Sequence, residues 1–165
     1  MSGLHDSLLV IGIAAAPIVE LRGSIPFAVG VLHMSVLQAV VLSVVGNSLL
    51  LFAVYAVGGW WIGLMSSRQG LLPRMTNRVL TRAGRVMGNG RYERYGLLAL
   101  TLFVAVPLPM TGVLTGSVAA LLFGLSLRKA GPYILLGMLM AAIVVTLITT
   151  GALSFLRFLI SAPTI

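Results

Sequence analysis

The chain consists of long apolar stretches separated by two short polar interruptions. Two apolar stretches, residues 36–64 and 133–155, are long enough to cross a hydrocarbon core of about 30 Å as helices that rise about 1.5 Å per residue. Shorter apolar legs flank the interruptions, Glu20–Pro26 and Val106–Gly112. The first leg, residues 8–19, reaches only about 18 Å as a helix. The pattern therefore predicts two full spans and short helices that turn back inside the membrane.

The first interruption is expected to break the backbone between two helical legs. Gly23 tolerates backbone angles that other residues resist, and Ser24 suits the N-cap of a helix. Pro26 suits the first turn of a helix. We therefore expect a second leg over residues 25–32, and its N-terminus lies deep in the membrane.

The second interruption has the same form. Pro107 and Pro109 end the leg over residues 97–106, because proline cannot continue a helix. Thr111 can cap a new leg over residues 112–127. A second helix N-terminus is therefore expected at depth.

The two halves share one plan of short leg, interruption, short leg, turn and full span. If each pair of legs is a re-entrant hairpin, each half crosses the membrane once and the second half is inverted. Four complete spans are the alternative, but they would place Arg128 and Lys129 outside, against the positive-inside rule. We expect an all-α integral membrane protein with two inverted repeats, at about 7–64 and about 96–157. Each repeat is a re-entrant helical hairpin followed by a full transmembrane helix.

The loop between the repeats, about 65–95, is strongly basic. Apolar residues recur in it at helical spacing, and arginines occupy the other face. This predicts a cytoplasmic amphipathic helix over residues 72–87 that lies on anionic lipid. No recognition motif accompanies the charge, so nucleic acid is not an expected partner. The arginines of this loop are Arg68, Arg74, Arg78, Arg82, Arg85, Arg91 and Arg94.

Composition supports a single membrane domain over residues 1–165. Hydrophobic residues make up 59% of the chain and charged residues 8%, against about 25% charged in soluble domains. The formal net charge is +8 and there is no cysteine. Two histidines and three acidic residues leave little for a metal site or acid–base catalysis. We expect no cofactor and no metal. The sequence carries no hydrolase signature, so we do not expect an enzyme.

The sequence Glu20-Leu21-Arg22-Gly23-Ser24-Ile25-Pro26, followed by Pro107-Leu108-Pro109-Met110-Thr111-Gly112, resembles the small multidrug export family. Members are short prokaryotic membrane proteins with Glu-x-Arg-Gly-small-x-Pro and Pro-x-Pro-x-Thr-Gly signatures, and Gly often stands where this chain has Met110. The resemblance implies export of small compounds across the inner (plasma) membrane by a multi-pass protein. The two-hairpin plan also looks like DedA-type proteins, which are associated with lipid scrambling and with recycling undecaprenyl phosphate. That likeness concerns architecture alone.

The two interruptions supply the candidate site. Arg22 offers a permanent charge and a planar fork that suits phosphate or carboxylate, and two helix N-termini at depth favour the same anions. Glu20 could neutralise Arg22 when the site is empty. Asn47, central in the first long stretch, needs a partner for its amide, such as the backbone of an interruption. The candidate substrate-binding residues are Glu20, Arg22, Gly23, Ser24, Pro26, Asn47, Pro107, Pro109, Thr111, Gly112 and Thr115.

Structural roles are the alternative for these residues. Glu20 and Arg22 could form a buried polar clamp between the hairpins, and Thr111 and Thr115 could serve only capping and packing. Small residues of the first long stretch, such as Gly46, could serve only to let helices pack closely. Asn47 differs from them because its amide needs a partner.

Three functions follow from these features. The first is a small transporter whose midplane site moves an anionic or amphipathic substrate, such as a lipid-linked phosphate carrier of the undecaprenyl phosphate kind. The second is a multidrug exporter coupled to protons. The third, of another class, is a non-transporting membrane scaffold or insertase, which leaves Glu20 and Arg22 unexplained. A homodimer would help to shield the hairpins, and coupling to protons or to sodium stays open.

Overall fold

A computed structural model describes residues 2–66, 90–108 and 111–161. The helices are α1 (Ser2–Ala15), α2 (Glu20–Gly30), α3 (Val36–Ser66), α5 (Gly90–Ala105), α6 (Val113–Leu122) and α7 (Leu127–Ser161). No strand occurs in these ranges. The expectation of an all-helical protein is confirmed, whereas the surface helix expected over residues 72–87 lies outside the described residues.

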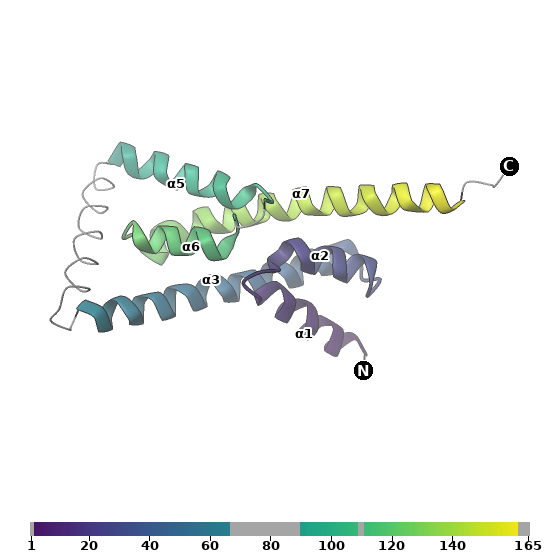
Figure 1. The fold of residues 1–165 in the computed structure, drawn as a ribbon, viewed down its shortest axis with the longest axis horizontal. Coiled ribbons are helices and arrows are strands. Elements are labelled where there is room, and N and C mark those ends of the chain that lie inside the picture. Colours follow the sequence, from purple (N-terminus) through teal and green to yellow (C-terminus); the bar gives the residue numbers. More distant parts are fainter. Residues whose placement is uncertain (1, 67–89, 109–110, 162–165) are drawn as a thin grey trace.

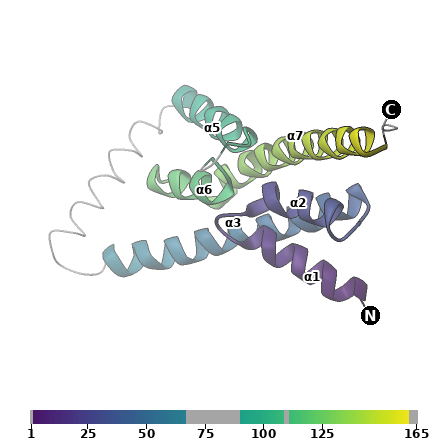
Figure 2. The ribbon, with the colours of Figure 1, turned by 45° about the vertical axis from the view of Figure 1, so that its right-hand side comes forward.

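The two long helices run in opposite directions, and each carries a pair of short helices (Figure 1). The α1–α2 pair enters from one end of the molecule and turns back near its centre, and the α5–α6 pair does the same from the other end (Figure 2). Helix α1 packs on α3 and α5 packs on α7, while α6 contacts α3 and α2 contacts α7. Each pair of short helices therefore packs on the long helix of its own half and on that of the other half.

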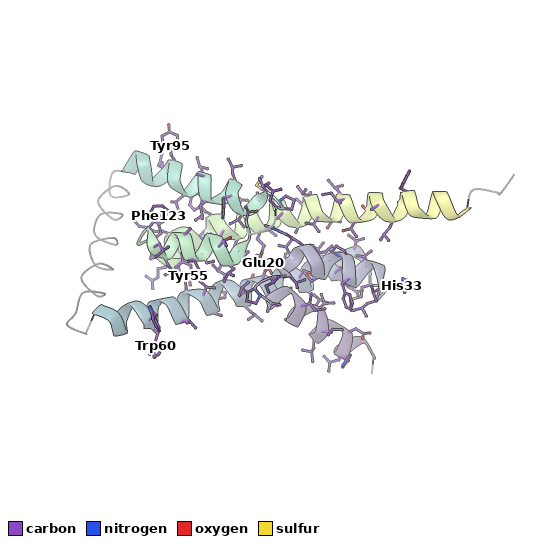
Figure 3. The ribbon with its side chains drawn as sticks, in the orientation of Figure 1. Glu20, His33, Tyr55, Trp60, Tyr95 and Phe123 are labelled. Atoms are coloured by element: carbon purple, nitrogen blue, oxygen red, sulfur yellow. The ribbon has the colours of Figure 1, made fainter. Side chains whose placement is uncertain are left out.

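The long helices have the length and composition of membrane spans. The apolar segments are Val36–Trp61 and Leu127–Phe155, with mean hydropathies of 2.2 and 2.3. In the most apolar 18-residue stretch of each segment, only 28% and 39% of the residues are buried. Trp60 and Tyr95 project at the same end of the molecule, as such side chains do at a membrane interface (Figure 3). These features fit a membrane protein with lipid-facing long helices.

The break in the first half lies before the residues that were expected to form it. It covers residues 16–19, and α2 already begins at Glu20, so the expectation of a second leg starting at Ile25 is wrong. Pro17 gives the reason, because the residue before a proline disfavours the α conformation and α1 ends at Ala15. Pro26 is tolerated inside α2. It forgoes one helical hydrogen bond, to the Arg22 carbonyl.

Helix α1 also begins earlier than expected, at Ser2 instead of near Leu8. The Ser7 hydroxyl donates to the Gly3 carbonyl at 2.6 Å, one turn back within the helix. The polar start of the chain extends the helix because nothing in it breaks the backbone.

The second half departs from expectation at three boundaries. Helix α5 begins at Gly90, well before Leu97, and α6 ends at Leu122. Gly124 closes α6 with a φ of 71°, a left-handed conformation that glycine adopts without strain. Helix α7 then begins at Leu127 instead of Tyr133, so the basic turn Arg128–Pro132 belongs to its first turns.

A glycine on each long helix lets a short helix approach closely. At Gly46 of α3, a Cβ atom would overlap the Ile11 carbonyl of α1. At Gly137 of α7, it would lie 2.9 Å from the Val104 Cβ of α5. The close packing expected at Gly46 is therefore present, and Gly137 repeats it in the second half.

Candidate functional site

The two breaks meet at the centre of the molecule, and Glu20 lies at their contact (Figure 3). Glu20 is 6% exposed. Its Oε2 accepts a hydrogen bond from the Val113 backbone N–H at 3.1 Å, and its Oε1 accepts one from the Leu114 N–H at 3.0 Å. These amides begin α6, where a helix has no internal acceptor for them. The carboxylate of the first hairpin therefore caps a helix of the second, at an end that favours an anion.

The backbone at Glu20 adopts an uncommon conformation. Its φ of 49° lies in the left-handed region, which residues other than glycine seldom occupy. Its N–H donates to the Ala16 carbonyl at 3.1 Å, which closes the break between α1 and α2. Backbone strain of this kind persists where the surrounding contacts fix it, and here the bonds to α6 do so.

Gly112, directly before α6, leaves the space that the Glu20 carboxylate fills. A Cβ atom at this position would overlap the carboxylate. The Gly112 N–H donates to the Thr115 hydroxyl at 3.0 Å, as in one half of a capping box. Gly112, and not Thr111, occupies the N-cap position of α6, and it has no side chain that could cap the helix. The expectation that Thr111 caps α6 is therefore wrong, and Glu20 accepts these hydrogen bonds instead.

Arg22 joins the same two tips through a second set of contacts. Its Nη2 donates to the Thr111 carbonyl, to the Thr111 hydroxyl at 3.1 Å and to the Val106 carbonyl at 3.4 Å. The Thr111 hydroxyl also lies 2.7 Å from the Val106 carbonyl oxygen and 2.9 Å from that of Leu108. Thr111 thus closes the loop of the second break and presents it to Arg22.

Glu20 and Arg22 form no ion pair with each other among the residues that the structure describes. Each binds the backbone of the second hairpin, although they come from the same turn of α2. The expectation that Glu20 neutralises Arg22 in the empty site therefore stays a prediction, and any such effect acts without a direct ion pair. The two charges instead hold different parts of the opposite tip.

A cavity of about 550 Å³ lies against this contact. It brings together five of the expected site residues, and Thr111 adjoins it through Arg22. The break of the first hairpin supplies much of the remaining wall. The lining residues are Pro17, Ile18, Val19, Glu20, Arg22, Pro107, Gly112, Leu114 and Thr115.

Three expected site residues of α2 lie outside the cavity lining. The Ser24 hydroxyl pairs with that of Ser43 at 2.6 Å, buried between α2 and α3. Gly23 lies under Val19 of the break, where a Cβ atom would overlap the valine side chain. Pro26 lies farther along α2. These residues therefore support the tip from behind. Pro109 lies outside the described residues.

Asn47 is fully buried on α3, but neither polar atom of its amide has a hydrogen-bond partner in the described structure. It lies one helical turn from Ser43, which places it near the tip of the first hairpin. The expected bond to the backbone of an interruption is absent from the described contacts. A buried amide without a partner is costly, so Asn47 is a candidate functional residue.

Ser117 is a residue that the sequence analysis missed. It is fully buried on α6, and its hydroxyl also lacks a partner in the described structure. A signal for it exists, because Leu114-Thr115-Gly116-Ser117 repeats the Leu-x-Gly-Ser pattern of Leu21-Arg22-Gly23-Ser24. Both copies lie in the first two turns of the inner helix of a hairpin. Within the described ranges, no three His, Asp or Glu side chains gather to hold a metal ion.

Comparison with known proteins gives one family. The family model described as "Putative small multi-drug export protein" matches residues 20–144, which is most of the chain. The match begins at Glu20 and includes both hairpin tips. Neither the curated proteins nor the solved structures gave a match.

Proposed function

The chain belongs to the small multidrug export family, and from this premise we propose that it is a transporter whose site lies between two re-entrant hairpins. The proposed architecture is a pair of inverted repeats with both tips at the bilayer midplane. Backbone breaks at that depth must be buried in protein or line a cavity, and the breaks here meet each other beside one. The basic loop would face the cytoplasm, and a homodimer would shield the hairpins.

The observation that carries the proposal is the Glu20 carboxylate at the N-terminus of α6. An anion already occupies a position that favours anions, and it belongs to the protein itself. A phosphate group that entered the cavity could replace the carboxylate at the amides of Val113 and Leu114. Arg22 would then supply the opposite charge from the cavity wall. This chemistry suits an anionic or amphipathic substrate, such as a lipid-linked phosphate carrier.

Movement of such a substrate would use the contacts between the tips. Glu20 and Arg22 hold the hairpins together through a few hydrogen bonds, which an entering phosphate would compete for. Released tips could part toward one side of the membrane or the other. This is the alternating access that inverted repeats support in other transporters.

A second candidate is export of a cationic or amphipathic drug coupled to protons, and the family description favours it. Glu20 borders a cavity whose other walls are mainly apolar. Arg22 would repel a cation at the same wall, so the geometry favours an anionic substrate over a cationic one.

The test is substrate movement in vesicles that contain the full chain. A fluorescent polyprenyl phosphate in one leaflet becomes accessible to an impermeant quencher when it crosses, and a cationic dye with a proton gradient provides the alternative substrate. Dye movement without movement of the phosphate would favour the drug exporter. No movement of either substrate would favour a scaffold or insertase.

The double variant Glu20→Gln with Arg22→Gln separates transport from clamping. It removes both charges but leaves groups that can still hydrogen-bond, so the hairpins should stay associated. We expect a stable protein that does not move the phosphate. Full flux from this variant would show that the two charges serve only as a clamp.

A further inference from the structure

A second cavity of about 510 Å³ lies beside the first, and every residue that lines it is apolar. It forms a groove between α3, from Leu50 to Trp61, and α6, from Leu114 to Leu122. At about 1.5 Å per residue, the α3 wall is about 17 Å long. The groove has the length and the apolar lining that one hydrocarbon chain needs.

The two cavities are adjacent along the protein. Pro17 and Leu114 line both of them. At that junction, the walls change from the charged cavity with Glu20, Arg22 and Thr115 to the apolar groove. The far end of the groove reaches Trp61, which is 56% exposed. A molecule with an anionic head in the first cavity would therefore have its apolar chain directed past Pro17 and Leu114 into the groove.

We propose that the groove between α3 and α6 holds the hydrocarbon chain of the molecule whose anionic head occupies the cavity between the tips. This inference rests on the proposed function and narrows its substrate to an anionic amphiphile with a long chain, as opposed to a free anion. Bilayer lipid is as apolar as the groove, so the groove adds little affinity by burial alone. Its role is to orient the chain so that the head reaches Arg22.

Gly58 explains how the groove and helix contact coexist. It lies on the α3 wall, where a Cβ atom would stand 2.6 Å from Leu121 Cδ1 of α6. Helices α3 and α6 thus touch at Gly58, and the rest of the groove between them stays open. A larger side chain in the groove would displace a hydrocarbon chain bound there.

The experiment uses the full chain in phosphatidylcholine vesicles with hexadecyl phosphate that carries a photoreactive diazirine at the chain end. After irradiation, mass spectrometry locates the labelled residues. We expect labels on α3 and α6 along the groove, which excess unlabelled hexadecyl phosphate removes and excess hexadecanol or inorganic phosphate does not. Groove labels that hexadecyl phosphate fails to remove would mean that bulk lipid fills the groove, and the inference would fail.

A matched pair of variants makes the test specific. Ala53 lines the groove, whereas Ala56 is exposed on the same helix and does not. Ala53→Trp should remove most of the competed labelling, because the indole would fill the space of the hydrocarbon chain, and Ala56→Trp should leave it unchanged. Equal labelling in both variants would overturn the inference. A changed oligomeric mass in Ala53→Trp alone would assign the groove to a second copy and also overturn it.

Failure of the groove inference differs from failure of the proposed function. If only the groove assignment is wrong, butyl phosphate still protects the Glu20 carboxylate at the hairpin tips from carboxylate-modifying reagents in the wild type, and not in Arg22→Gln. If the proposed function is wrong, neither butyl phosphate nor hexadecyl phosphate protects the tips in any variant.

Discussion

The backbone of Gly112 lies so close to the Glu20 carboxylate that a side chain at residue 112 would occupy the position of the carboxylate. The contact joins two hairpins from opposite halves of the chain. It also explains why α6 needs no capping side chain of its own, because Glu20 accepts the hydrogen bonds that a cap would accept. The site therefore depends on the absence of a side chain as much as on the two charges.

Gly112→Ala should displace the Glu20 carboxylate and make the protein easier to unfold. The lost bonds join a charged group to backbone amides, so we expect a loss of about 2 to 3 kcal/mol in the free energy of unfolding, with reduced transport. Gly59→Ala is the control, because its Cβ would contact nothing within 4 Å. Thermal unfolding in detergent measures both variants. Equal stability of the two would contradict the capping role of Glu20.

Glu20→Gly should convert the capped end of α6 into an open anion site. The change removes the carboxylate and also relieves the left-handed backbone, since Glu20 has a φ of 49°. Inorganic phosphate should then raise the melting temperature of Glu20→Gly in a saturable manner, because the freed amides and Arg22 can bind it.

Glu20→Gln is the control for that experiment. Its neutral amide oxygen is a weaker cap than the carboxylate and does not repel an anion, so phosphate should stabilise this variant less than Glu20→Gly but more than the wild type. Phosphate that stabilises neither variant would argue against an anion site at the tips. Chloride at matched ionic strength separates phosphate binding from general salt effects.

The sequence predicts the long helices and the residues that meet at the hairpin tips, but the predicted position of the first break is wrong. Apolar length alone predicts α3 and α7, since few other structures satisfy such stretches. Local signals at Gly23, Ser24 and Pro26 suggested a helix start, whereas Pro17 determines the break. Ser24 lies inside α2 because its hydroxyl finds Ser43 on α3, a contact that the residues around Ser24 do not reveal.

The capping of α6 by Glu20 was also beyond the sequence. The residues at the interruptions indicate an anion site at the helix ends and suggest that Glu20 neutralises Arg22, but they do not indicate that Glu20 caps α6. Which partner a carboxylate takes depends on distances across the hairpins, and these arise only when both halves pack. Asn47 shows the same limit, because its burial could be anticipated and its lack of a partner could not.

Cysteine labelling can determine whether the hairpins turn back inside the membrane. His5 and His33 are both exposed, and Figure 3 places His33 at the end of the molecule where the N-terminus lies. If the first hairpin is re-entrant, impermeant reagents should label His5→Cys and His33→Cys from the same side, and Ser126→Cys from the other. Four complete spans would instead place His5 on the opposite side from His33. Labelling of intact and opened cells measures this directly.

Asn47→Leu should separate stability from function. The wild-type amide is fully buried, and neither of its polar atoms has a partner in the described structure. Leucine has a similar size and no polar atoms, so the free energy of unfolding should stay the same or rise by about 1 to 2 kcal/mol. If the amide serves the substrate or the moving tips, phosphate flux in vesicles should fall in this more stable protein. Ser48→Ala at the next position of α3 is the control, because in the described part of the chain the Ser48 hydroxyl bonds within its own helix, to the Val44 carbonyl at 2.7 Å. A stable Asn47→Leu variant with full flux would assign no transport role to Asn47, whereas a destabilised one would mean that the amide has a partner in the membrane.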